Sequence, residues 1–176
     1  LIVSYENKPI RRGLKSRDFT QLGNTPINWV NVSVNRSFLN WLASYVSLAQ
    51  RKSGAKTPPH YSPLGIAAMV REYVDFLSIR GGKAAITIDY DRWVVDAGYR
   101  ARRLKALGLE VVDNSIGERQ VYGKGSSFEG RSTEVDPAAQ LGRWKEMQDN
   151  HLFSVLVDLA AQDDELLTLL EKGYPA

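Results

Sequence analysis

The stretch 29–50 changes from one hydrophobic period to another within a few residues. Val30, Val32 and Val34 alternate with polar residues, and this period of two predicts a β-strand. From Phe38 the apolar side chains recur every three or four residues, which predicts a helix whose apolar face is made of Leu39, Leu42, Tyr45, Val46 and Ala49. A strand that leads at once into a helix is typical of α/β proteins, so this stretch constrains the fold class of the chain.

Later segments repeat the same alternation. The apolar spacing predicts a helix over 64–77, and the short apolar run 84–90 predicts a strand. A second helix is expected over 91–107 with Gly108 at its carboxyl end, followed by a short extended segment at 109–112. Because helix separates the two strands, we expect a right-handed crossover and a parallel sheet.

Both ends of the chain carry further predicted elements. The apolar residues 1–3 predict a strand that ends near Glu6, and helices are expected over 136–151 and 153–172. In the last helix we expect these apolar residues to be core: Val155, Leu156, Leu159, Leu166, Leu167 and Leu170. Since the sequence begins inside a predicted strand, we expect residues 1–176 to form a single domain that is incomplete at its amino terminus.

Composition excludes several classes of protein. The 43% apolar content and four Trp residues favour a globular domain over a disordered chain. No apolar run reaches the roughly 20 residues of a membrane-spanning helix. With no cysteine and only His60 and His151, the sequence predicts neither a disulfide framework nor a zinc site, and we expect a cytoplasmic protein.

Charge is unevenly distributed along the chain. Residues 1–56 contain nine Lys and Arg against two acids, whereas the whole protein carries a net charge of only +3. A basic amino-terminal third favours an anionic ligand. The alternative is a basic face that is simply solvated.

The turn between the first two elements of 29–50 carries Asn35, Arg36 and Ser37. Sheets of parallel strands bind anions at such turns, because backbone N–H groups and the helix dipole point there. Ser44 follows Arg36 by eight residues, about two helical turns, so both side chains should lie on one side of the helix. The pair predicts a phosphate site; the alternative is that Arg36 pairs with a neighbouring carboxylate.

Three other segments are candidates for function. Glu6 is expected at the carboxyl edge of the sheet, where it would be either a general base or an ordinary surface acid. The Gly- and Ser-rich segment 122–131, with Lys124 and Arg131, would be either an anion-binding loop or a flexible connector. The proline-containing segment 51–62 would be either a substrate-contacting lid or a tolerated insertion.

Taken in order, these motifs resemble the sulfotransferases that use 3′-phosphoadenosine 5′-phosphosulfate (PAPS). In that family a strand leads into an Arg, and a Ser eight residues later completes the site for the donor's 3′-phosphate. The segment from Arg36 to Ser44 has this spacing, although Ser37 and Phe38 replace the family's usual Asp or Asn and Pro.

Other parts of the chain are similar to the family as well. Residues 86–93 resemble the strand that many members follow with Tyr and Glu, and 123–128 is similar to the Gly-Ser-Ser-Phe loop of some bacterial members. Arg143 and Trp144 resemble a feature downstream of that loop, and Glu6 occupies the place of the catalytic His or Glu.

The resemblance implies a P-loop-NTPase-like fold of three layers, in which helices flank a parallel sheet that lacks its first strand and phosphosulfate loop. It implies transfer of a sulfuryl group from PAPS to a hydroxyl or amine of a saccharide or small molecule, without a metal. Glu6 would be the base. The residues that it implies as nucleotide contacts are Arg36, Ser44, Tyr90, Lys124, Gly125, Ser126, Ser127, Phe128 and Arg131.

Two other functions remain open from the sequence. A P-loop kinase would share the sheet and the basic sites, but it needs a Walker Lys and Ser or Thr that this sequence lacks. A non-catalytic module would use the basic third to bind an anionic ligand or polymer. The partners implied by the resemblance are a nucleotide donor and a hydroxyl-bearing acceptor, not nucleic acid, and the oligomeric state stays open.

Overall fold

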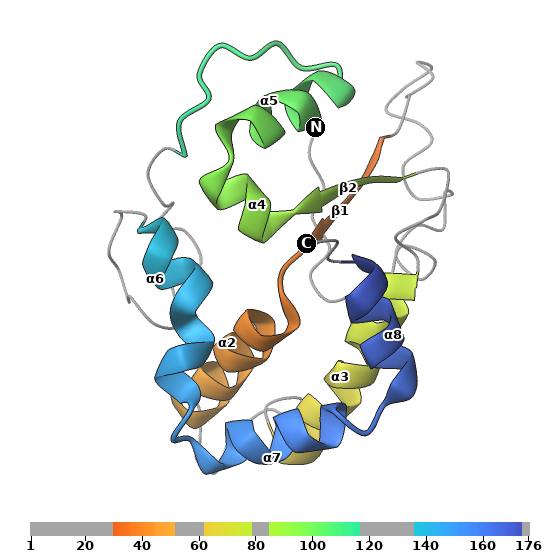
Figure 1. Cartoon of the computed structure of the whole chain (residues 1–176), viewed down its shortest axis with the longest axis vertical. Helices are drawn as coiled ribbons and strands as arrows, with labels where there is room; N and C mark the ends of the chain where they lie inside the picture. Colours follow the sequence, from red (N-terminus) through yellow and green to blue (C-terminus); the bar gives the residue numbers. More distant parts are fainter. Residues whose placement is uncertain (1–29, 52–61, 79–84, 117–135, 174–176) are drawn as a thin grey trace, which may run out of the picture.

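A computed structural model describes residues 30–51, 62–78, 85–116 and 136–173 of the chain (Figure 1). These residues form a mixed α/β structure that is mostly helical. In chain order the elements are β1 (Asn31–Asn35), α2 (Phe38–Arg51), α3 (Pro63–Ser78), β2 (Ala85–Asp89), α4 (Tyr90–Val95), α5 (Ala97–Ala106), α6 (Pro137–Gly142), the 3₁₀ helix η2 (Arg143–Met147), α7 (His151–Ala160) and α8 (Asp164–Gly173). Among the described helices, none is long and apolar enough to cross a membrane.

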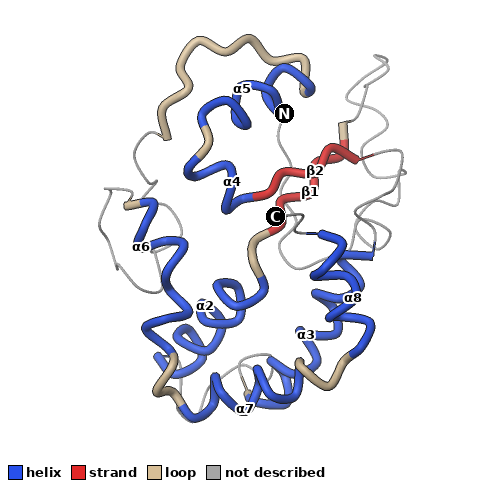
Figure 2. Tube along the Cα trace, in the orientation of Figure 1, coloured by secondary structure: helices blue, strands red, loops and turns tan. Residues whose placement is uncertain are grey.

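The two described strands pair in parallel, as the alternation of elements predicts. The register runs from Asn31 opposite Ala85 to Asn35 opposite Asp89. Figure 2 shows the strands near the middle of the molecule, with α4 to their left, α5 above and α2, α3, α7 and α8 below. Because both strands end at the same edge, the next residues along the chain, Arg36 and the first residue of α4, are brought to one place.

Alternating valines in a strand usually mark its buried face, but in β1 they mark the exposed one. Val30, Val32 and Val34 are 55%, 40% and 56% exposed, whereas Ser33 and Asn35 on the other face are only 7% and 4% exposed. A period of two identifies a strand but does not say which face is covered, because burial depends on the elements that pack there. The buried face of β1 is therefore polar as it approaches the strand end.

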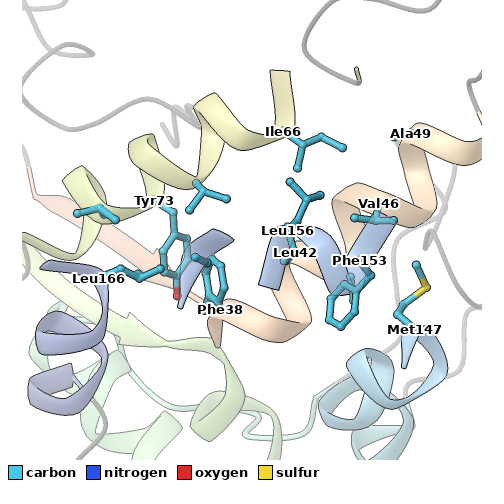
Figure 3. Close-up of a cluster of buried hydrophobic side chains, with 14 residues drawn as sticks. Phe38, Leu42, Val46, Ala49, Ile66, Tyr73, Met147, Phe153, Leu156 and Leu166 are labelled. Carbon is cyan, nitrogen blue, oxygen red and sulfur yellow. The ribbon is translucent and has the colours of Figure 1, made fainter. Parts of the chain in front are cut away.

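The hydrophobic core lies among α2, α3, η2, α7 and α8. Figure 3 shows its side chains converging from these helices: Phe38, Leu42, Val46, Ala49, Ile66, Tyr73, Met147, Phe153, Leu156 and Leu166. The predicted apolar face of α2 is confirmed, since Leu42 and Val46 are fully buried. Trp41 and Tyr73 pack with their ring centroids 4.8 Å apart, which ties α2 to α3.

The single helix predicted over 91–107 is wrong in one respect, because the structure breaks it at Asp96. This residue has an extended backbone (φ −111°, ψ 98°), and its carboxylate accepts a hydrogen bond from the Tyr99 N–H at 2.7 Å. An Asp side chain competes with helical backbone bonding and favours such an amino-terminal cap. The Tyr99 hydrogen bond, with the charges of Arg102 and Arg92, holds the pKa of Asp96 below its ordinary value of 3.8.

The predicted end of the second helix is confirmed, and the segment after it belongs to no described strand. Gly108 has a φ of 72°, the left-handed conformation that terminates helices. Residues 109–112 form no strand. Further along, the buried Arg100 donates to the carbonyl oxygens of Trp93 and Asn114, at 2.6 and 2.9 Å, and so fastens the chain at Asn114 to α4 and α5.

The two long helices predicted at the carboxyl end are each divided. The first becomes α6 and η2, and the second becomes α7 and α8, separated by a turn in which the Asp163 carboxylate accepts from the Leu166 N–H. This change of direction alters which side chains reach the core. Leu156 and Leu166 are buried and Leu170 packs against the core, but the expectation was wrong for three residues that are exposed: Val155, Leu159 and Leu167.

Candidate functional site

Arg36 lies at the carboxyl end of β1, where side chains from three elements meet. Its Nη1 donates to the Ser44 hydroxyl at 3.2 Å, and its Nη2 donates to the Gln140 carbonyl oxygen at 3.0 Å. The guanidinium carbon also lies 5.4 Å from the centroid of the Tyr90 ring, a cation–π distance. Ser44 of α2, Tyr90 at the end of β2 and Gln140 of α6 thus surround the guanidinium of Arg36.

The helical spacing explains why Ser44 reaches Arg36. Arg36, Asn40 and Ser44 are separated by four residues each, so they follow one stripe of α2 and the turn before it. The Ser44 hydroxyl also donates to the Asn40 carbonyl oxygen at 3.0 Å, a back-bond of the kind that Ser makes within helices. This bond leaves the oxygen of Ser44 oriented as the acceptor for Arg36.

Asn40 fastens this stripe to the carboxyl-terminal part of the chain. Its side chain is 3% exposed. The amide nitrogen donates to the Ser37 hydroxyl at 2.8 Å and to the Leu141 carbonyl at 2.9 Å, and the amide oxygen accepts from the Trp144 N–H at 3.3 Å. A buried amide with all these partners holds α6 and η2 against α2.

Gln140 is the point where both strand ends contact α6. Besides the bond from Arg36 to its carbonyl, its side-chain oxygen accepts from the Tyr90 hydroxyl at 2.5 Å. Its side chain is 2% exposed. On the other side of the turn, the Tyr73 hydroxyl of α3 donates to the carbonyl oxygen of Arg36. The backbone and the side chain of Arg36 are therefore both positioned by other elements.

The amino end of α2 differs from the sequence expectation of free backbone N–H groups. The Ser37 N–H donates to a carboxylate oxygen of Asp91, Oδ2, at 3.2 Å. Asp91 follows directly after Tyr90 in α4, so β2 delivers both residues to the same edge. A carboxylate at a helix amino terminus is favourable because its negative charge is attracted to the positive end of the helix dipole. An internal acid thus already occupies a position that we expected an anionic ligand to use.

Two buried polar atoms near this turn lack hydrogen-bond partners in the described part of the chain. They are the side-chain nitrogen of Asn35, whose oxygen accepts from the Ser33 hydroxyl, and Oδ1 of Asp91. Burying such an atom without a partner costs roughly 1–3 kcal/mol, and more where charge is involved. Both belong to segments that flank Arg36.

Of the site residues expected from the sequence, the structure brings Arg36, Ser44 and Tyr90 together. The remaining expected site residues lie outside the described residues: Glu6, Lys124, Gly125, Ser126, Ser127, Phe128 and Arg131.

Sequence reasoning missed three polar residues of this cluster, namely Asn40, Gln140 and Asp91. Asn40 carried a usable signal, because it lies midway between Arg36 and Ser44 at helical spacing. Gln140 and Asp91 carried none, since their roles depend on contacts across 104 and 54 residues of sequence.

Two surface hollows on the described residues lie elsewhere. One has a volume of about 150 Å³ between α3 and α7, and the other has about 230 Å³ between α2, η2 and α7. Ligand pockets are usually about 300–1,000 Å³, so both are small for a nucleotide. Within the described ranges, no three His, Asp or Glu side chains group closely enough to hold a metal ion.

Comparison with known proteins adds no relative: no protein-family model, curated protein or solved structure matches this chain.

Proposed function

We propose that this protein is a PAPS-dependent sulfotransferase, in which Arg36 and Ser44 bind the 3′-phosphate of the donor. The observation that carries the proposal is the convergence of these two side chains at the shared carboxyl edge of two parallel strands, at 3.2 Å from one another. Their spacing was expected from the sequence motif. A hydroxyl and a guanidinium side by side match a phosphate, which accepts a charge-assisted and a neutral hydrogen bond.

The proposal includes a specific exchange of partners at Arg36. In the described structure Nη2 contacts the neutral carbonyl oxygen of Gln140. A phosphate oxygen carries negative charge and is a stronger acceptor, so a bound 3′-phosphate would replace this carbonyl. The Ser44 hydroxyl would rotate away from its back-bond to Asn40 so that it donates to the phosphate.

In the proposed reaction the acceptor hydroxyl attacks the sulfur of PAPS. A new O–S bond forms as the bond between sulfur and the 5′-phosphate oxygen breaks, and a base, for which we propose Glu6, takes the hydroxyl proton. Residues of 123–131 would enclose the nucleotide. The acceptor class is a saccharide or a small molecule. We also propose that the chain has the three-layer, P-loop-NTPase-like fold of the sulfotransferase family and that it is cytoplasmic. The sequence alone supports these two points.

The proposal predicts selective binding of the desulfonated product, 3′-phosphoadenosine 5′-phosphate. Calorimetric titration should show at least about tenfold tighter binding of this nucleotide than of 5′-AMP, about 1.4 kcal/mol. Arg36→Ala should remove the preference, because a hydrogen bond to a charged group contributes about 1.5–3 kcal/mol.

Arg51→Ala is the matched control, since Arg51 is an exposed cation at the other end of α2. It should leave the preference unchanged. Equal or absent binding of both nucleotides by the wild type would discard the sulfotransferase assignment. Salt-sensitive binding of anionic polymers that persists in Arg36→Ala would instead favour the non-catalytic module.

A further inference from the structure

The two carboxylate oxygens of Asp91 lie in different environments. Oδ2 accepts the Ser37 N–H at 3.2 Å, one residue beyond Arg36, whereas Oδ1 is buried and has no hydrogen-bond partner among the described residues. The first contact fixes where the side chain lies, beside the Arg36 turn. The second leaves an acceptor there that is not used.

Asp91 comes directly after Tyr90, whose ring centroid lies 5.4 Å from the guanidinium carbon of Arg36. A group attached to a phosphate on Arg36 and Ser44 would extend toward this acceptor. The guanidinium of Arg36 offsets the charge of a phosphate bound to it, whereas a second phosphate or carboxylate directly against Asp91 would meet its negative charge at a strong penalty. A hydroxyl group does fit, because it donates to the carboxylate oxygen. In a 3′-phosphorylated ribonucleotide, the 2′-hydroxyl is on the ring carbon next to the phosphate-bearing one.

We propose that Asp91 accepts a hydrogen bond from the ribose 2′-hydroxyl and so selects a 3′-phosphorylated ribonucleotide over its 2′-deoxy and 2′-phosphate analogues. This inference rests on the proposed function, because it takes the Arg36–Ser44 pair as the phosphate site. It adds a specificity-determining residue that the sequence motif did not indicate.

The ribose would reach Asp91 through the same change in which a phosphate replaces the Gln140 carbonyl as the partner of Arg36. α6 packs against α4, the helix that carries Asp91, and Gln140 of α6 is bonded to both Arg36 and Tyr90. A phosphate that replaces the Gln140 carbonyl therefore has to move α6 away from the strand ends. This movement would uncover the unused oxygen of Asp91 as the nucleotide enters.

The test compares three nucleotides by calorimetry on the full chain: 3′-phosphoadenosine 5′-phosphate, its 2′-deoxy analogue and adenosine 2′,5′-bisphosphate. In the wild type we expect the ribonucleotide to bind about tenfold more tightly than the deoxy analogue, since a charge-assisted hydrogen bond is lost. The 2′,5′ isomer should bind more weakly still, because its phosphate would face the carboxylate.

Asp91→Asn is the informative variant, because its amide oxygen can still accept the Ser37 N–H while an NH₂ group replaces the unused oxygen. It should lower the ribose-to-deoxyribose ratio, because the neutral NH₂ group makes at most a neutral hydrogen bond to the 2′-hydroxyl in place of a charge-assisted one. Asp158→Asn removes the same charge from an exposed position on α7 and should keep the wild-type ratio. Thermal unfolding confirms that each variant is folded.

The outcomes separate this inference from the proposed function. If the wild type prefers 3′-phosphoadenosine 5′-phosphate to 5′-AMP but binds the deoxy analogue equally well, the role of Asp91 is refuted while the phosphate site stands. A tenfold ratio that persists in folded Asp91→Asn also refutes it. If the wild type binds none of the nucleotides, both proposals fail.

Discussion

Replacing Asn40 with Ala tests whether one buried amide holds the carboxyl-terminal elements against α2. The side chain is 3% exposed and makes three hydrogen bonds, to Ser37, Leu141 and Trp144. Each such bond contributes about 1 kcal/mol net, which gives about 3 kcal/mol. The variant also leaves the Leu141 carbonyl and the Trp144 N–H without this partner, so the loss could reach about 5 kcal/mol.

Urea unfolding followed by circular dichroism measures this loss directly. We expect the free energy of unfolding to fall by about 3–5 kcal/mol, a large part of the roughly 5–15 kcal/mol typical of a domain. The slope of the transition should not change, because the folded structure is otherwise the same. For a domain of this size the midpoint of thermal unfolding should fall by roughly 6–20 °C.

Gln148→Ala is the control, because this amide side chain is exposed. Its effect should stay within about 0.5 kcal/mol. A loss below about 1 kcal/mol for Asn40→Ala, with an unchanged slope, would refute the reasoning. It would mean that water or other side chains satisfy the same backbone groups equally well.

Two further predictions concern stability. Leu42→Ala should lower the free energy of unfolding by about 2–5 kcal/mol in the same urea assay, because Leu42 is fully buried in the core and its truncation leaves a cavity; a loss under about 1 kcal/mol would contradict the packing in Figure 3. The lowered pKa of Asp96 means that its charged form stabilises the folded protein above the ordinary carboxyl pKa of 3.8, and that this contribution is lost as the pH falls through the lower folded value. The stability of the wild type relative to Asp96→Asn should therefore decline in that acidic window, and an Asp96 carboxyl that titrates at or above 3.8 by NMR would exclude the Tyr99 cap as described.

Local patterns in the sequence predicted several elements well. The change of period at Phe38 located the end of β1 and the start of α2, and the apolar spacing of α3 and the run that forms β2 were recognised in the same way. Gly108 was expected to end a helix and does so with a positive φ. Such features depend on residues within a few positions of one another, and short-range periodicity records them directly.

Long helices were predicted less well because local capping divided them. Asp96 carries a signal of its own, since Asp is a good amino-terminal cap, but the apolar spacing on both sides continues through it. At the carboxyl end, the turn between α7 and α8 redirected the apolar face, so that Val155 and Leu159 became exposed while Leu156 and Leu166 stayed buried. Periodicity alone does not distinguish a continuous helix from two that meet at an angle.

The candidate site, too, was predicted in part from local sequence and decided in part only by the tertiary structure. The spacing of Arg36 and Ser44 was sufficient to predict that they approach each other, because both belong to one helix and the turn before it. By itself, therefore, the sequence determined β1, β2, the main helices and the pairing of Arg36 with Ser44, since each depends on interactions within a few residues. Only the tertiary structure decided that the valines of β1 face outward, and that Gln140 and Asp91 join Arg36, because packing and hydrogen bonding between distant segments are set when the elements assemble.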